Sequence, residues 1–453
     1  MRRLRALLTV LVGGLALTIG ADAQPQPRIV NGTNTNDFPE VGMLLILASP
    51  TDESVVSLCS GTLLGCRSFV TAAHCVCPFR TDDAATCETR GLADPRELSV
   101  FLAHVGRTDV TRVAIHPDFD FTHGGDLAVV TLASPVATVE PASVNGVGRP
   151  TLGTEATIVG FGNTGGPTFN QNDFGIKRRG TVHTSLCTAD VDANNHVCWE
   201  FGDVGSNTCG GDSGGPMFID FGTGRRVAGV TSGGHSPTCL APDTGFDTDI
   251  FVHLDWLGEA LFESESGAPC PDGPRLGSDL VTTQYADGVL RRSDNAKSFP
   301  ISVPENAARM VVTLNGALFS DNVGATTNEF SLFVLRAGAA VPDCVDTTLG
   351  PFDVCTIEQP AAGAWEARVT RLRGAGEFQV TTTIFLTQPP PPCAGDCDAD
   401  GQVTAVEILA GVARAFATNG RDDCANFDAD DSGTVTANEI VLAIRNALGE
   451  CER

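Results

Sequence analysis

Positive charge is scarce in this chain. Its 453 residues include 29 Lys and Arg against 55 Asp and Glu, which gives a formal net charge of −26 at pH 7. Such an acidic surface repels phosphate backbones and anionic membranes, so a nucleic-acid partner is not expected. We interpret the acidity as a solvated surface, and an acidic interaction tail is the alternative.

Long apolar runs and helical periodicity are scarce as well. Beyond the N-terminal segment no stretch is long enough to span a bilayer. Apolar residues at helical spacing are largely missing before roughly the last sixty residues, and short Val- and Thr-containing runs bounded by turn residues fill the rest. The chain is therefore predicted to be mainly all-β, and its length predicts more than one compact domain.

The N-terminus has the pattern of a secretory signal peptide. Three arginines among the first five residues precede an apolar stretch from Ala6 to Ile19, and small residues lead to a cleavage position after Ala23. A single-pass anchor is the alternative, but the apolar stretch is short for a bilayer. Residues 1–23 are predicted to be the signal peptide. The 16 cysteines agree with secretion, because an oxidising compartment lets them pair.

Three short segments carry the residues needed for acyl transfer. Gly210–Pro216 sets Ser213 among glycines, Thr71–Cys75 contains His74, and Asp126 precedes an apolar run. A hydroxyl nucleophile needs a base, a carboxylate that orients the base, and backbone donors for the oxyanion. We assign these roles to Ser213, His74, Asp126 and main-chain N–H groups of the glycine-rich segment. Taken singly, each segment could be an ordinary turn, core histidine or strand cap.

Together these motifs resemble the trypsin and chymotrypsin family of serine proteases. Ile29-Val30-Asn31-Gly32 comes first, and the segments containing His74, Asp126 and Ser213 follow in the order typical of that family. The resemblance covers residues 29–262. Four motifs in order are far more specific than one. The resemblance implies a double β-barrel and a serine endopeptidase that works through an acyl-enzyme intermediate.

The resemblance also implies activation by proteolysis. Residues 24–28 would form an activation propeptide, and cleavage after Arg28 by an activating protease would free the amino group of Ile29. In this family that amino group pairs with the Asp beside the nucleophile, which here is Asp212. The buried ion pair would lock the loop that carries Gly211 and Ser213, whose N–H groups the resemblance implies as the oxyanion donors.

Substrate choice is read from the positions that match the family's primary pocket. Asn207 stands at the pocket floor, where trypsin-like enzymes have a carboxylate, so specificity for Arg or Lys is not supported. Gly234 and Gly245 match wall positions, and their small size predicts an open pocket for a large neutral or polar side chain. Asp247 replaces the usual tyrosine and could bring a carboxylate near the pocket. Ser232 begins the segment expected to pair with the substrate backbone.

Six disulfides are expected. The resemblance implies three of them, a local loop closure suggests a fourth, and the cysteines left over in the protease and the linker suggest a fifth. A sixth would be a short-range bridge in the following domain. In that order the pairs are Cys59–Cys75, Cys187–Cys198, Cys209–Cys239, Cys77–Cys87, Cys66–Cys270 and Cys344–Cys355.

A second β-rich domain follows the protease. The apolar spacing of Phe251–Phe262 predicts a terminal helix, after which residues 263–274 form a linker and residues 275–387 a β-sandwich without an acid–base constellation. The run Cys355–Val369 resembles the bacterial pre-peptidase C-terminal domain. A generic sandwich spacer is the alternative. Residues 388–395 form a linker that contains Pro389–Pro392.

Residues 396–453 contain an internal repeat that predicts calcium binding. Each unit has an acidic loop with a glycine, a glutamate that closes the loop, and an apolar helix. The predicted ligands are Asp396, Asp398, Asp400, Gln402 and Glu407 in the first unit, and Asp428, Asp430, Ser432, Thr434 and Glu439 in the second. The repeat resembles EF-hands and most closely dockerin modules, which implies docking onto a scaffold or cell-surface protein. An acidic disordered tail is the alternative.

Two functional hypotheses remain open from the sequence. The first is a secreted serine endopeptidase acting on proteins or peptides. The alternative is a protease-like binding protein that docks through its C-terminal module without cleaving anything. Ser213, His74 and Asp126 are all present, which favours the enzyme.

Overall fold

The structure is a computed structural model of the chain. It describes residues 29–77, 83–121, 123–165, 173–202, 204–267, 269–319, 327–387, 394–397, 403–416, 427–428 and 434–450. The predicted signal peptide, the propeptide up to Arg28 and the run Pro389–Pro392 lie outside these residues. Within the described ranges, no helix is both long and apolar enough to cross a membrane.

The first part of the chain folds into a closed six-stranded barrel. Its strands follow the order β2-β3-β4-β7-β6-β5, and all neighbours are antiparallel. Leu44, Phe69 and Val130 are completely buried in its core because apolar side chains of each strand turn inward. The strands are β2 (Val41–Ser49), β3 (Asp52–Leu63), β4 (Ser68–Thr71), β5 (Leu98–Leu102), β6 (Gly106–Ile115) and β7 (Ala128–Leu132).

A second barrel follows. Its sheet has the order β1-β9-β10-β13-β12-β11-β8, and β8 also pairs with β9, so six of the seven strands close into a ring. Ile158, Trp199 and Met217 fill its centre. The predicted double β-barrel is thus confirmed. The strands are β1 (Thr33–Asn34), β8 (Glu155–Gly160), β9 (Arg178–Ser185), β10 (His196–Phe201), β11 (Pro216–Asp220), β12 (Arg225–Gly234) and β13 (Asp243–Asp249).

The helices of this part are short, and the last one differs from its predicted bounds. Residues Ile250–His253 form the 3₁₀ turn η3, and the α-helix α2 spans Leu254–Glu265. The helix therefore continues into the predicted linker, because the Glu265 carboxylate is held by the backbone N–H of Arg67 at 2.9 Å and the hydroxyl of Ser68 at 2.6 Å. The other helical segments are η1 (Ala73–Cys75), α1 (Ala84–Arg90) and η2 (Pro95–Glu97).

Two four-stranded antiparallel sheets follow, which we name the two-sheet domain (residues 281–386). One sheet has the order β14-β21-β16-β19 and the other β15-β20-β17-β18. Leu314 and Phe378 of the first sheet share one apolar core with Leu332 and Trp365 of the second. The strands are β14 (Val281–Leu290), β15 (Ala296–Val303), β16 (Ala307–Gly316), β17 (Glu329–Arg336), β18 (Cys344–Asp346), β19 (Phe352–Glu358), β20 (Gly363–Arg373) and β21 (Gly376–Leu386).

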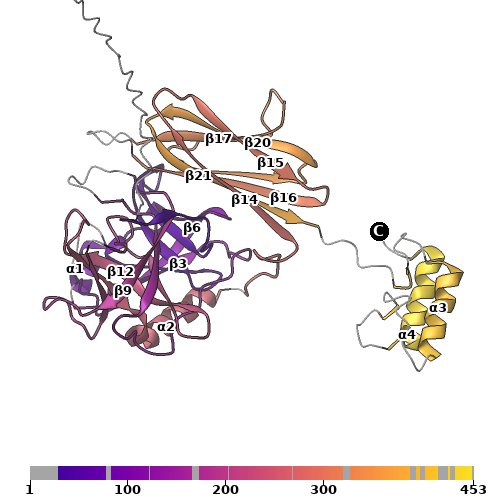
Figure 1. Ribbon diagram of the computed structural model, residues 1–453, viewed down its shortest axis with the longest axis horizontal. Coiled ribbons are helices and arrows are strands. Elements are labelled where there is room, and N and C mark those ends of the chain that lie inside the picture. Colours follow the sequence, from indigo (N-terminus) through magenta and orange to yellow (C-terminus); the bar gives the residue numbers. More distant parts are fainter. Residues whose placement is uncertain are drawn as a thin grey trace, which may run out of the picture.

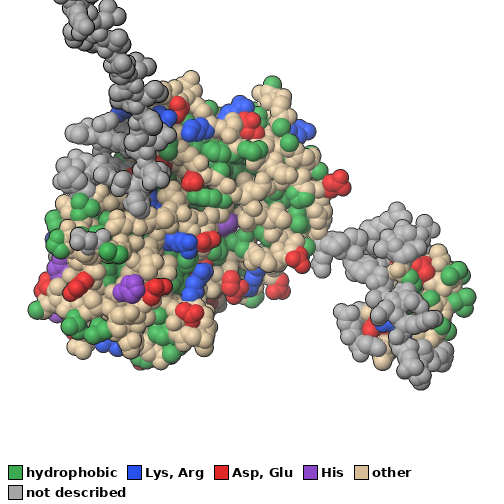
Figure 2. Space-filling model, in the orientation of Figure 1, with side chains coloured by type: hydrophobic (Ala, Val, Ile, Leu, Met, Phe, Trp, Pro, Cys, Tyr) green, Lys and Arg blue, Asp and Glu red, His purple; other side chains and the backbone are tan. Residues whose placement is uncertain are grey.

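The two-sheet domain lies directly against the barrels (Figure 1). Phe352 and Leu318 belong to the same apolar cluster as Phe101 and Phe161 of the barrels. On the face shown in Figure 2, acidic side chains are spread over both parts and do not gather in one patch, as expected for a solvated surface.

Near the C-terminus two helices lie side by side (Figure 1). They are α3 (Ala405–Phe416) and α4 (Ala437–Arg445), followed by the π-helical turn η5 (Asn446–Glu450). Val403, Phe427, Val435 and Ala443 form a small apolar core here. A helix therefore follows each of the two predicted calcium loops.

All six predicted disulfides are present. They are Cys59–Cys75, Cys66–Cys270, Cys77–Cys87, Cys187–Cys198, Cys209–Cys239 and Cys344–Cys355. The bond between Cys66 and Cys270 joins residues 204 positions apart and fastens the first barrel to the segment that leads into the two-sheet domain.

Removing this long-range bond is expected to destabilise the protein more than removing a short-range one. Cross-linking removes more chain entropy from the unfolded state when the closed loop is longer. We expect the double variant Cys66→Ser, Cys270→Ser to lose about 3–5 kcal/mol of unfolding free energy, and Cys344→Ser, Cys355→Ser about 2–3 kcal/mol. Denaturant titration followed by tryptophan fluorescence measures both, and an equal or smaller loss for the first variant would contradict the expectation.

Candidate active site

His74 is fixed by a buried carboxylate. It lies in η1 directly after β4, and its Nδ1 is 2.7 Å from Oδ2 of Asp126. The backbone N–H of His74 donates to the other oxygen, Oδ1, at 2.9 Å. Asp126 is completely buried, whereas 21% of the His74 side chain is exposed. These contacts make Nδ1 the protonated nitrogen and leave Nε2 as the nitrogen available to act as a base.

Asp126 stays ionised despite its burial. Burial alone would raise its pKa, but the charge of His74 and hydrogen bonds from His74 and Ser232 outweigh this, so the pKa lies below its usual value. The Ser232 hydroxyl donates to Oδ2 at 2.6 Å. A carboxylate at this position can stabilise a positive charge on the imidazole when His74 takes up a proton.

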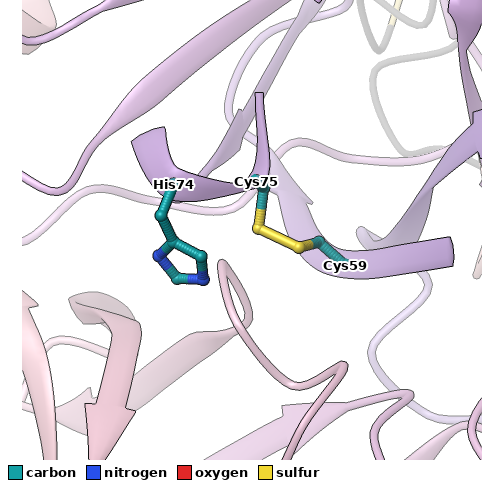
Figure 3. A group of neighbouring side chains, drawn as sticks. All are labelled: Cys59, His74 and Cys75. Atoms are coloured by element: carbon teal, nitrogen blue, oxygen red, sulfur yellow. A yellow bond between two sulfur atoms is a disulfide. The ribbon is translucent and has the colours of Figure 1, made fainter. Parts of the chain in front are cut away.

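A disulfide tethers the loop that carries His74. Figure 3 shows His74 beside the Cys59–Cys75 bond, and ligand atoms of these three residues lie within 4.8 Å of one another. Both sulfur atoms are used in the disulfide, so neither is a thiolate that could bind a metal. The cluster therefore fixes the position of His74.

Ser213 lies in a tight turn that packs against the same region. Its carbonyl oxygen accepts a hydrogen bond from Ser60 N at 2.8 Å and lies 3.8 Å from Sγ of Cys75. Gly214 has a φ of 81°, and a Cβ there would lie 2.1 Å from Oγ1 of Thr71. Only glycine allows this approach. The structure thus brings the loop of Ser213 against the segment that contains His74.

The backbone around Ser213 provides two available donors. Among the residues that the structure describes, the N–H groups of Gly211 and Ser213 donate to no other group. Gly211 has a φ of 95°, and its carbonyl oxygen is held by the Ser60 hydroxyl at 2.9 Å. Two neighbouring N–H groups of this kind suit the negative oxygen of a tetrahedral intermediate.

Asp212 lies buried behind this turn. Its Oδ1 accepts from Gly162 N at 2.7 Å and its Oδ2 from Cys209 N at 2.9 Å. Burial raises its pKa to about 7, although these hydrogen bonds and Arg178 favour the ionised form. Ile29 is also completely buried, in the core of the second barrel. Arg28, the predicted cleavage site, lies outside the described residues.

Asn207 is held rigidly by its neighbours. Its Oδ1 accepts from Nε1 of Trp199 at 3.1 Å, and its Nδ2 donates to Oδ2 of Asp243 at 2.7 Å and to the Cys239 carbonyl at 3.2 Å. The sequence analysis did not predict Asp243 as a pocket residue, because it stands in a turn-like run without a distinguishing motif. The fold places this carboxylate beside Asn207, and a Cβ at Gly234 would lie 3.2 Å from its Oδ2.

The other predicted pocket residues lie on β12 and β13. Gly234 pairs with Gly245, where a Cβ would lie 2.2 Å from the Trp199 ring. Gly245 is therefore required by the packing of Trp199. Asp247 is completely buried and pairs with Val197 and Thr231. Burial raises the pKa of Asp247 well above its usual value. The carboxylate that contacts Asn207 belongs to Asp243.

Buried carboxylates also occur in both C-terminal repeats. Asp396, Glu407 and Glu439 are all buried. Glu407 accepts from Cys397 N at 2.7 Å and from Thr404 N at 2.6 Å, and Glu439 accepts from Thr436 N at 2.6 Å. Carboxylate oxygens at the ends of both loops are the donors that calcium prefers, so the described residues fit this ion. Asp428 and Thr434 are described as well. The remaining predicted ligands, Asp398, Asp400, Gln402, Asp430 and Ser432, lie outside the described residues.

Comparison with known proteins places this architecture in one family. The family model described as Trypsin matches residues 30–257. A trypsin of Saccharopolyspora erythraea is 33% identical over 246 residues, which covers 51% of this chain and 98% of that protein. A trypsin of Phaedon cochleariae is 29% identical over 268 residues, covering 56% and 96%. The solved structure of neuropsin, a serine protease expressed in the limbic system of mouse brain, covers 51% of this chain and 98% of its own at 21% identity, with a TM-score of 0.39.

The matched residues run from Val30 to the first turn of α2 and include His74, Asp126 and Ser213. The chain therefore belongs to the trypsin family of serine endopeptidases.

Proposed function

We propose that this protein is a secreted serine endopeptidase that hydrolyses peptide bonds through an acyl-enzyme intermediate. The main support is the contact of 2.7 Å between Nδ1 of His74 and Oδ2 of Asp126. It lies beside a turn in which the N–H groups of Gly211 and Ser213 donate to no other group of the described residues and can bind an oxyanion. Six disulfides and the predicted signal peptide over residues 1–23 support secretion.

The geometry suggests a role for each group in the reaction. Ser213 Oγ attacks the substrate carbonyl carbon while Nε2 of His74 takes its proton, and the Gly211 and Ser213 N–H groups stabilise the oxyanion. His74 then gives the proton to the leaving amine, which departs as the acyl-enzyme forms. Water attacks the acyl-enzyme by the same route and restores Ser213. Asp126 remains ionised throughout and stabilises the protonated His74.

Labelling with a serine-reactive organophosphate tests this function. The chain cleaved after Arg28 is expected to bind one label per molecule at Ser213, and Ser213→Ala is expected to bind none, because the label needs an activated hydroxyl. Ser206→Ala, which removes another buried serine in the second barrel, is the matched control and should still be labelled. Mass spectrometry measures the label. Absence of labelling and of peptide or ester turnover after cleavage would instead support the protease-like binding protein.

We also propose that cleavage after Arg28 switches the enzyme on. In the uncut chain Asp212 accepts two backbone hydrogen bonds, and no cationic group of the described residues contacts its carboxylate directly. A new amino group at Ile29, which is buried in the same barrel, would supply the positive charge and favour ionised Asp212.

Blocking this cleavage is expected to keep the protein inactive. Arg28→Gln removes the cleavage site, so trypsin treatment should raise the hydrolysis of a peptide ester by more than about a hundredfold for the native chain and hardly at all for the variant. N-terminal sequencing verifies whether the product begins at Ile29. Full activity of native protein that still begins at Gln24 would contradict the proposal.

The residues beside the predicted pocket support a large neutral or polar side chain as the preferred substrate group. The Asn207 amide has its hydrogen-bonding groups engaged by Trp199, Cys239 and Asp243. Asp243 in turn accepts from the backbone N–H groups of His235, Ser236 and Thr244, at distances of 3.0, 2.6 and 2.8 Å. Because its carboxylate is already compensated in this way, it offers less attraction to an Arg or Lys side chain than a carboxylate at the position of Asn207.

We propose that the two remaining domains are accessory modules of the peptidase and that the last one attaches it to another protein. The two-sheet domain would be a pre-peptidase C-terminal-like module, and residues 396–453 a calcium-binding module of the EF-hand or dockerin type that docks onto a scaffold or cell-surface protein. The support is the repeated loop pattern, the helix after each loop, and the buried Glu407 and Glu439.

Calcium binding can be measured on the full chain made inactive by Ser213→Ala. Calorimetry is expected to show about two calcium ions per chain, and Glu407→Gln or Glu439→Gln should each remove about one, because each variant lacks one loop-closing carboxylate. Glu358→Gln, in the two-sheet domain, is the control and should bind like the parent. If calorimetry detects no calcium binding to the parent chain or to any variant, the result favours an acidic tail without a metal site.

A further inference from the structure

A buried polar seam joins the two-sheet domain to residues 174–178 of the protease. Leu318 N donates to the Phe174 carbonyl at 2.9 Å, and Asn315 Nδ2 donates to the Gly175 carbonyl at 2.8 Å. Gln379 bonds to both backbone groups of Lys177, accepting from its N–H at 2.8 Å and donating to its carbonyl at 3.2 Å. The two-sheet domain thus binds the backbone of this segment through one backbone group and two side-chain amides.

These contacts are shielded from water. Gln379 is 2% exposed and Asn315 is 1% exposed, and Asn315 Nδ2 also donates to Oε1 of Gln379 at 2.7 Å. Separating the domains would leave several buried amide groups without partners, at a cost of about 1–3 kcal/mol each where water cannot replace them. The seam therefore holds residues 174–178 in one position.

The same segment also contacts the turn that carries the proposed oxyanion donors. The ring of Phe174 packs edge-on against Phe319, with ring centres 5.3 Å apart. A Cβ at Gly211 would lie 3.4 Å from Cβ of Phe174 and 3.0 Å from Cα of Gly162. Phe174 is therefore packed between the second domain and Gly211.

Arg178 forms a second link between the same parts. Its side chain is completely buried, and its Nη1 donates to the carbonyl oxygens of Gly162 at 3.0 Å and Asp173 at 3.3 Å. Its Nη2 lies 3.6 Å from Oδ2 of Asp173 and 3.5 Å from Oε2 of Glu377. An arginine keeps its charge in proteins, so its burial requires negative partners, and Glu377 of the two-sheet domain is one of them.

The Gly162 peptide connects Arg178 to Asp212. Its carbonyl oxygen is held by Arg178, and its N–H donates to Oδ1 of Asp212 at 2.7 Å. A Cβ at Gly162 would lie 2.4 Å from Cγ of Asp212, so the two backbones are in close contact. Asp212 stands between Gly211 and Ser213 in the chain, so a shift of Gly162 would move the donors on either side.

We propose that Arg178 is a positioning residue for the oxyanion donors, and that the two-sheet domain, through Glu377 and Phe319, holds it and Phe174 in the active arrangement. The second domain is then a working part of the catalytic unit and more than an attached spacer. This inference rests on the proposed peptidase function, because the loop it stabilises is the one that would bind the oxyanion.

The test compares two glutamates that each form an ion pair with an arginine far away in the chain. Glu377→Gln removes the charge that the two-sheet domain presents to Arg178. Glu140→Gln removes the exposed partner of Arg275, which precedes the two-sheet domain, and is the control. Both are made in the full chain and activated by cleavage after Arg28. Activity is expressed per active site titrated with the organophosphate, so that unfolded molecules do not count.

For Glu377→Gln we expect kcat to fall about tenfold while KM changes less than about twofold, because donors that contact only the oxyanion act mainly in the transition state. Affinity for a peptide boronate, which forms a tetrahedral adduct, should fall by a similar factor. Phe319→Ala should lower kcat in the same way. Glu140→Gln should leave kcat, KM and boronate affinity unchanged.

Other outcomes would overturn the inference. If Glu377→Gln and Phe319→Ala match the native enzyme per titrated site, or if Glu140→Gln shows the same loss, the second domain does not position the donors. If Glu377→Gln yields no folded protein, Phe319→Ala alone decides by the same measurements. If the native chain is neither labelled nor active after cleavage, the proposed function itself fails, and that result is distinct from a native enzyme that the variants leave unaffected.

Discussion

The site depends on a fully buried negative charge at Asp126. A carboxylate removed from water is costly unless charge and hydrogen bonds compensate it, and here His74 and Ser232 do so. His74 lies in η1, Asp126 just before β7, and Ser232 in β12, so the charge ties the first barrel to the second. The orientation of the His74 ring then follows from its two hydrogen bonds to Asp126. The turn that carries Ser213 packs against the segment that contains this histidine.

A second buried charge extends the same logic to the neighbouring domain. Arg178 begins β9 and cannot lose its proton, so it must be surrounded by oxygen atoms wherever the chain places it. Its partners Gly162 and Asp173 lie between β8 and β9, and Glu377 lies near the start of strand β21 of the other domain. One buried cation therefore joins the segment beside Asp212 to a sheet about 200 residues later in the chain.

The C-terminal repeat follows a different organisation. Among the residues of this repeat that the structure describes, the apolar core gathers around Phe427 and Ala443. If buried acids such as Glu407 and Glu439 bind calcium as proposed, the metal would add to the free energy of folding of this repeat. The proposed calcium sites would thus contribute to structure as well as to docking.

The sequence by itself determined the family, the barrel class, all six described disulfides, and the choice of His74, Asp126 and Ser213 as candidates for the site, because these are set by short motifs and by the chemistry of each side chain. It did not reveal Asp243 beside Asn207, the role of Trp199 at Gly245, or the continuation of α2 to Glu265. It also gave no sign of Arg178 and Glu377 as partners. Only the tertiary structure decided these features, because burial and pairing between residues far apart in the chain depend on which surfaces meet, and no local pattern encodes that.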